Sequence, residues 1–236
     1  MLCAKHIYSV VRMNVEDTLT EFEKDITALV FKENYPCIAA LKTLSTGQYR
    51  TGVFGALGAG DHSGRLAKDL LALRDEQQKT GSLELSYFAV FPDLIDMNEE
   101  DFEKRLWKEL SHLTEVPHID QSWDPAFSDN PEDKNFCFSL GGTAFFVVGM
   151  HQNSSRLSRR TRYPTLVFNV YEQFKELDRR NRYQPMIKAN RKRDMLFQGD
   201  VNPMSEKYND TWEAIQFSGR NNSDDWVCPF HKGARK

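Results

Sequence analysis

The strongest constraint on the fold is a pair of strand-like runs joined by two glycines, NFCFSL-GG-TAFFVVGM, over residues 135–150. Two glycines between β-rich runs are typical of a two-residue hairpin turn, which needs positive φ angles. The second run is apolar along most of its length, so we expect both of its faces to be covered. The sequence therefore predicts a β-hairpin over residues 135–150 whose second strand is mostly buried.

Amphipathic helices and further strands surround this hairpin in the sequence. Apolar residues spaced three and four apart predict helices, and alternation predicts a strand with Leu85, Tyr87, Ala89 and Phe91 on one face. The order predicts one α+β domain over residues 1–236, with a mainly antiparallel sheet and flanking helices. The predicted elements are a helix over 15–32 capped by Asn14, strand fragments and turns over 37–60, a helix from Asp61 or Ser63 to Gly81, a strand over 83–91, a helix opened by Asn98, a surface loop over 116–133, a strand over Thr165–Val170, a helix with Phe174 and Leu177, a helix from Pro185 to Gly199, and a packed tail with Trp212, Phe217, Trp226 and Phe230.

Composition points to an ordinary soluble protein. Apolar residues make up 40% and charged residues 28% of the 236, and the net charge is -3. No stretch is long and apolar enough to span a bilayer, and the N-terminus lacks a signal-peptide pattern, so we expect a cytoplasmic protein with no membrane partner. Residues 151–193 are strongly basic, but basic and aromatic residues are not interleaved there as in a nucleic-acid platform, so no nucleic-acid partner is expected.

Several common sites are excluded by the absence of their motifs. The chain has no GxxxxGK[ST], HExxH, GxSxG or CxxC pattern. Its cysteines, at positions 3, 37, 137 and 228, are far apart and are expected to be mostly small buried hydrophobes. Phosphate-loop enzymes, zincins and elbow-type hydrolases are therefore not expected.

His151 stands where the apolar strand ends and a serine- and arginine-rich loop begins. A neutral imidazole delivered there by a rigid strand could ligate iron. A hydrogen bond that caps the strand end is an equally good interpretation of the local pattern. Cys228, in CPF, is a second candidate iron ligand, although a buried structural cysteine is the commoner outcome.

Five strings of the sequence together resemble the YqcI/YcgG family. They are FFVVGMHQNSSRLSRRTRYPTLVFNVYEQF, RKRDMLFQGDVNPM, FSGR, CPF and the earlier YPCIAA, and they span most of the chain. The resemblance implies a haem protein whose better understood relatives are haem-dependent oxygenases that N-hydroxylate arginine or a related guanidino compound. Many relatives have no assigned reaction.

The resemblance also implies roles for residues at matching positions. His151 matches the family's histidine, although Gln152 stands where proline is more usual. Asn169 matches a pocket position, and Glu172 is the candidate carboxylate partner of a cationic substrate. The candidate partners of the haem propionates and pocket residues are Arg156, Arg159, Arg160, Arg191, Arg193, Gln198 and Asn202.

The leading hypothesis is a monooxygenase that holds haem b through His151, with Cys228 as the alternative ligand. It would use dioxygen, and electrons from a reductase or chemical reductant, to hydroxylate a nitrogen of a small amine or guanidino substrate. The alternatives are a non-enzymatic haem-binding or haem-sensing protein and a cofactor-free module that binds an anionic partner. A homodimer is left open.

Overall fold

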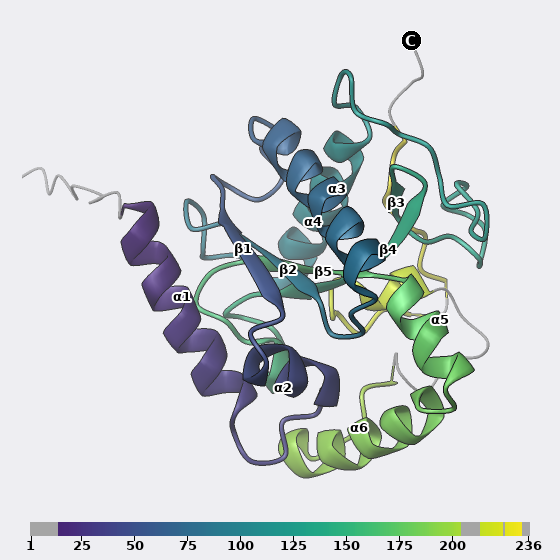
Figure 1. Ribbon diagram of the computed structural model, residues 1–236. Helices are drawn as coiled ribbons and strands as arrows, with labels where there is room; N and C mark the ends of the chain where they lie inside the picture. Colours follow the sequence, from purple (N-terminus) through teal and green to yellow (C-terminus); the bar gives the residue numbers. More distant parts are fainter. Residues whose placement is uncertain (1–13, 204–212, 224, 233–236) are drawn as a thin grey trace, which may run out of the picture.

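The computed structural model describes residues 14–203, 213–223 and 225–232 (Figure 1). These residues form one α+β domain in which helices cover both faces of a sheet. The elements are α1 (Val15–Val30), α2 (Ile38–Ser45), β1 (Tyr49–Val53), α3 (Ser63–Thr80), β2 (Ser86–Val90), α4 (Glu99–Leu113), β3 (Ser139–Leu140), β4 (Thr143–Met150), η1 (Leu157–Arg159), β5 (Thr165–Val170), α5 (Glu172–Arg179), α6 (Tyr183–Gln198) and η2 (Glu213–Gln216).

The described strands form one five-stranded sheet in the order β1-β2-β5-β4-β3. The β1 and β2 strands are parallel, and the other pairs are antiparallel. The predicted hairpin is confirmed, because β3 and β4 pair across Gly141 and Gly142, both with positive φ. The mainly antiparallel sheet is confirmed as well.

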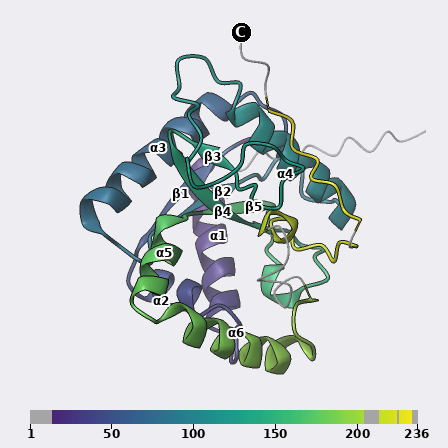
Figure 2. The same cartoon turned by 90° about the vertical axis from the view of Figure 1, so that its right-hand side faces the viewer.

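The sheet separates two packed layers. Figures 1 and 2 show α3 and α4 on one side of the sheet and α1, α2 and α6 on the other. Strand side chains alternate between these layers. The predicted strand face of Leu85, Tyr87, Ala89 and Phe91 is confirmed, since all four are buried in the α3/α4 layer. We call this side of the sheet the closed face, and the α1/α2/α6 side the cavity face.

Most predicted helices are confirmed, together with their ends. Asn14 and Asn98 cap α1 and α4 by accepting backbone N–H groups at 2.8 Å. Gly81 and Gly199 end α3 and α6 in the left-handed conformation. The strand over Thr165–Val170 and the following helix are also observed.

Three details of the prediction are wrong. Residues 38–45 form α2 instead of strand fragments, because IAALKTLS consists largely of good helix formers and the Cys37 sulfur caps its start. The N-cap of α3 is His62, whose side chain makes no capping bond. The α6 helix begins at Tyr183, two residues before Pro185.

The C-terminal segment packs on the closed face, as its aromatic residues predicted. Phe217 and Phe230 are fully buried against Trp107 of α4, and Trp226 packs at the edge of the same cluster. Trp212 lies outside the described residues. Glu103 of α4 then binds this segment through three polar contacts, which come from Ser218 at 2.8 Å, Arg220 at 3.0 Å and Asn222 at 2.7 Å.

Within the described residues, no helix is long and apolar enough to cross a membrane.

Candidate functional site

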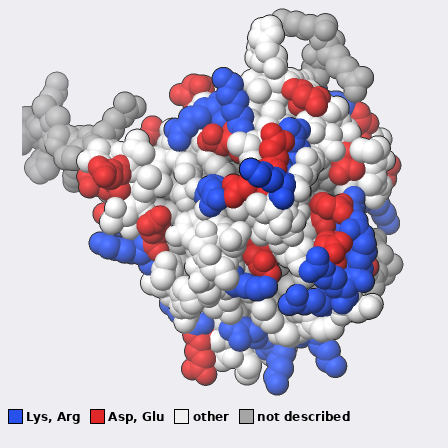
Figure 3. Space-filling model, in the orientation of Figure 1, with Lys and Arg blue, Asp and Glu red and all other residues white. Residues whose placement is uncertain are grey.

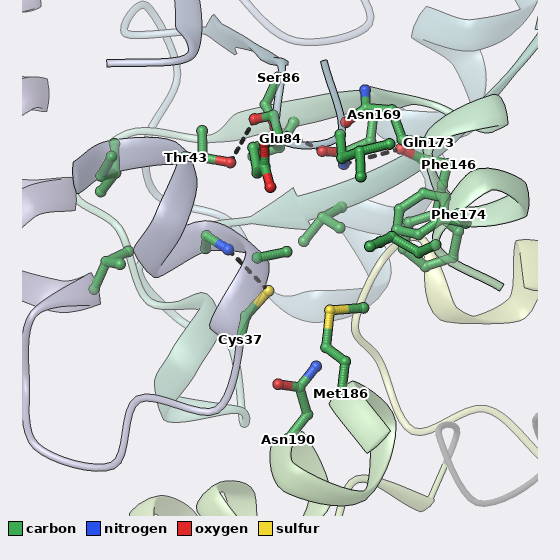
Figure 4. Close-up of a pocket in the computed structure, with 18 of the residues that line it drawn as sticks. Cys37, Thr43, Glu84, Ser86, Phe146, Asn169, Gln173, Phe174, Met186 and Asn190 are labelled. Atoms are coloured by element: carbon green, nitrogen blue, oxygen red, sulfur yellow. Dashed lines mark hydrogen bonds between the residues drawn. The ribbon is translucent and has the colours of Figure 1, made fainter. Parts of the chain in front are cut away.

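A large cavity lies on the cavity face, between the sheet and the helices α2, α5 and α6 (Figure 4). It encloses about 1250 Å³ of space, including its opening to solvent. One wall is the sheet, where Phe88, Val167 and Val148 lie opposite one another in register across β2, β5 and β4. The facing wall includes Leu44 of α2 and Met186 of α6. Two apolar walls and a few polar groups are typical of a small-molecule site.

Cys37 brings a sulfur atom into the cavity wall. It precedes α2, and its Sγ accepts the N–H of Ala40 with an N–S distance of 3.4 Å. Burial raises the pKa of the Cys37 thiol, while the N–H groups of Ala40 and Ala39 oppose that rise. A helix N-terminus stabilises negative charge, so this position suits a sulfur that gives up its proton to a metal.

The α5 end of the cavity carries amides whose orientation the hydrogen bonds fix. Asn169 Nδ2 donates to the carbonyl of Phe146 at 3.3 Å, so its Oδ1 accepts the Ser86 hydroxyl at 2.7 Å. Gln173 Nε2 donates to the carbonyl of Leu85 at 2.7 Å. Its Oε1 is thereby left as an acceptor on a side chain that is 3% exposed and lines the cavity.

Asn190 of α6 lines the same cavity near Cys37 (Figure 4). Its Oδ1 accepts the N–H of Ile38 at 3.0 Å, which leaves Nδ2 as a neutral donor. The contact fixes α6 against the start of α2. The two helices therefore hold the Cys37 wall in place together.

Two carboxylates, Glu84 and Glu213, line the cavity. Glu84 pairs with Lys42 near the surface, and Glu213 Oε1 accepts the Tyr171 hydroxyl at 2.7 Å. Glu172, the predicted carboxylate partner of the substrate, does not line this cavity. It lies on the outer side of α5 in ion pairs with Arg179 and Lys175.

His151 lies on the closed face, away from this cavity. Its ring is 1% exposed and stacks on Phe102 of α4, with centroids 4.3 Å apart. Neither ring nitrogen has a hydrogen-bond partner within the described residues, so no strand-capping side-chain bond is observed there. Burial lowers the pKa of His151 to about 4, and the imidazole is therefore neutral at pH 7.

The predicted arginines are dispersed instead of gathered around one anion site. Arg156 binds Asp194, at 2.7 Å, and Asp200. Arg160 donates to the Ser154 carbonyl at 2.7 Å. Arg193 donates to the Tyr35 carbonyl at 2.6 Å. Other predicted residues are also placed: Gln198 binds the η1 loop, the Asn202 backbone N–H donates to Asp194, and Arg191 is half-buried in α6.

Arg159 joins β4 to the C-terminal segment. Its guanidinium donates to the carbonyls of Gly149 at 3.3 Å and Phe217 at 3.0 Å. Burial lowers the pKa of Arg159 to about 10. Gly219, with φ of 82°, leaves room for this side chain, since a Cβ there would lie 2.5 Å from Arg159 Cδ. The FSGR string therefore has a structural role in this chain.

Cys228 is buried in the closed-face core, where burial raises its pKa to about 12. It does not line the cavity. Among the described residues, no group of three or more His, Cys, Asp or Glu side chains is arranged to hold a metal ion.

Positively charged side chains gather on part of the surface. Figure 3 shows Lys and Arg side chains gathered toward the lower part of the molecule, with acidic side chains among them on the right. Arg179 and Arg180 of α5 pair there with Glu172 and Glu176. Much of the positive charge on α5 is therefore neutralised locally.

Asn169 is the predicted pocket residue that lines the cavity. The sequence does not single out the other polar lining residues discussed above, which are Cys37, Gln173, Asn190, Glu84 and Glu213. The available signal for Cys37 was its position between a proline and a run of helix formers, YPC-IAALKTLS. The others face the cavity because of strand register and helix packing between distant segments. No local pattern encodes that arrangement.

The fold and the cavity define an α+β protein with a small-molecule site between its sheet and one helical layer. The chain matches the YqcI/YcgG family over residues 22–231, and it belongs to that family. No curated protein and no solved structure matches it.

Proposed function

We propose that the protein binds haem b in the cavity, where Cys37 would hold the iron, and hydroxylates a nitrogen of an amine or guanidine substrate. The observation that carries this proposal is a sulfur donor in the wall of a large apolar cavity. The flat, largely apolar porphyrin suits two facing apolar walls, and thiolate ligation suits oxygen chemistry. When bound, haem supplies the activation of dioxygen with electrons from an external donor.

The protein's own residues would bind the haem and orient the substrate. The N–H of Ala40 would stabilise the Cys37 sulfur as a ligand, and Asn190 would hold α6 against it. Phe146 and Phe174 pack edge to face at the α5 end and would exclude water from the substrate. Gln173 Oε1 would accept a hydrogen bond from the substrate nitrogen.

The proposal places the ligand differently from the sequence prediction of His151 or Cys228. Both residues lie among the closed-face side chains, and neither lines the cavity. The sheet stands between them and the cavity. Cys37 is the cysteine of the described residues that lines it.

The test is the absorbance spectrum of protein purified from haem-supplemented cells, oxidised and after reduction under carbon monoxide. We expect a thiolate-type spectrum that is lost in Cys37→Ala. The matched controls Cys228→Ala and His151→Phe should keep it, and circular dichroism checks that each variant folds. Colourless protein, or a spectrum lost only in a control variant, contradicts the proposal.

The proposed hydroxylation is tested by a separate measurement of oxygen uptake and product. We expect dioxygen uptake and hydroxylated product only when reductant and an amine or guanidine are both present. Haem binding without any substrate-dependent turnover would instead indicate a haem-binding or haem-sensing protein.

A further inference from the structure

The charged residues that line the cavity all have one sign. Among the described residues of its wall, Glu84 and Glu213 are the charged ones, and no Lys, Arg or His side chain lines it. Lys42, which pairs with Glu84, is about half exposed at the surface. The described wall therefore favours a cationic ligand over an anionic one.

The polar groups of the α5 end point to the same preference. Gln173 lines the cavity and is 3% exposed, and its Nε2 donates to the Leu85 carbonyl, which leaves Oε1 as an acceptor. Asn169 uses both ends of its amide within the protein. A ligand group that hydrogen-bonds to Gln173 Oε1 must therefore bring a donor, as an ammonium or guanidinium group does.

A carboxylate on the ligand would have no cationic partner on the described wall. Asn190 Nδ2, at the Cys37 end, and Gln216 Nε2 are donors among the lining residues, but both are neutral. A buried carboxylate without a counter-charge loses its hydration and gains little in return. Free α-amino acids carry such a group next to their ammonium.

We infer that the substrate bound at the α5 end of this cavity is a cationic amine or guanidine that carries no carboxylate. This inference rests on the cavity assigned under the proposed function and narrows its substrate class. Gln173 and Glu213 are the specificity-determining residues, because they contact the donor end of the ligand. Haem and the substrate would occupy different parts of the cavity, with the substrate at the α5 end and the two haem propionates at the opening to solvent, where they would stay hydrated.

The experiment measures the affinity of three related guanidines for the full chain by calorimetry, with and without added haem. Agmatine carries a guanidinium and an ammonium, 4-guanidinobutyrate carries a guanidinium and a carboxylate, and arginine carries all three groups. We expect agmatine to bind at least about tenfold more tightly than the other two. Arginine or 4-guanidinobutyrate binding as tightly as agmatine, or no binding of agmatine, overturns the inference.

Two variants test the assigned residues. Glu213→Gln keeps the shape and an acceptor for Tyr171 but removes the charge, so the preference for agmatine over 4-guanidinobutyrate should fall about tenfold. Gln173→Leu should weaken agmatine binding about tenfold. Its matched control is Gln77→Leu on α3, a buried glutamine whose Nε2 also donates to a carbonyl, at 3.3 Å, outside the cavity.

The outcomes separate the two proposals. Selective agmatine binding by protein that never shows a haem spectrum supports this inference and contradicts the haem proposal. A haem spectrum together with tight arginine binding supports the haem proposal and contradicts this inference. If both substituted variants bind agmatine as the unmodified protein does, the assignment of Gln173 and Glu213 is wrong.

Discussion

The two faces of the sheet are built from the same strands but are covered in different ways. On the closed face, α3, α4 and the C-terminal segment bury a continuous cluster of aromatic and aliphatic side chains. On the cavity face, α1 packs closely on the sheet through Phe22 and Ile26, but α2, α5 and α6 leave a cavity. The same strands therefore support a close-packed core on one face and a cavity on the other.

Gly149 shows how closely the closed face is packed. A Cβ at this position would lie 2.6 Å from Phe102 Cε1 and 2.9 Å from Leu106 Cδ1. The absence of a side chain lets α4 approach β4 directly. On the opposite face of the same strand, Val148 borders the cavity instead.

The largest expected effect compares one leucine from each face. Leu106→Ala on the closed face should lower the free energy of unfolding by about 3 kcal/mol, because a fully buried side chain is removed from a close-packed core. Leu44→Ala at the cavity should lower the free energy of unfolding by only about 1 kcal/mol, because the Leu44 side chain already borders empty space. Both residues are helical, so helix propensity changes equally. Urea denaturation measures both values, and equal losses would show that the two faces are packed alike.

The second expected effect is a pH dependence that comes from the closed face. The folded pKa of His151, about 4, lies below its ordinary value of 6.5. The unfolded chain therefore binds the proton first, and stability contributed by the neutral ring is lost as pH falls from about 6.5 to about 4, by up to about 3 kcal/mol.

His151→Phe tests this pH dependence. The phenylalanine ring can keep the stack on Phe102, so the variant should be at least as stable as the original at pH 7 and should lose less stability at pH 5. Unfolding free energies at both pH values measure it. An unchanged pH dependence would contradict the buried, neutral imidazole.

The smallest effect concerns the polar contacts that fix the C-terminal segment. Glu103→Gln keeps an acceptor for Ser218 and Asn222 but turns an amide toward Arg220, so it should cost about 1 kcal/mol. Hydrogen exchange in residues 216–222 should accelerate. The control Glu100→Gln removes an exposed pair with Lys104 on the same helix and should change nothing measurable. Equal effects of the two substitutions would mean that Glu103 does not hold the segment.

The fold could be predicted in most of its elements, because its signals are local. The glycine pair predicted the hairpin, and the spacing of apolar residues predicted α1, α3 and α4. Asn14 and Asn98 predicted where α1 and α4 begin. The α2 helix was missed, since a short run of helix formers beside glycines and threonines has weak periodicity. A sulfur cap is also a rare start signal.

The candidate site could be predicted only in part. Asn169 was placed in the pocket by its matching position, and it does line the cavity. His151 and Glu172 were chosen for chemistry and neighbourhood in sequence, but side-chain direction depends on strand parity and helix rotation. As a result of strand parity, His151 lies on the closed face, and as a result of helix rotation, Glu172 lies on the outer side of α5.

Residue types and their spacing along the chain suffice to predict most of the elements, the hairpin of β3 and β4, and the family, because each of these depends on local signals. The tertiary structure decided which face holds the cavity, and it brought together Cys37, Gln173 and Glu213 from distant segments. It also directed the arginines to carbonyls and carboxylates of the protein. The physical reason is that contacts across a sheet depend on register and packing, which are properties of the assembled layers and not of any one segment.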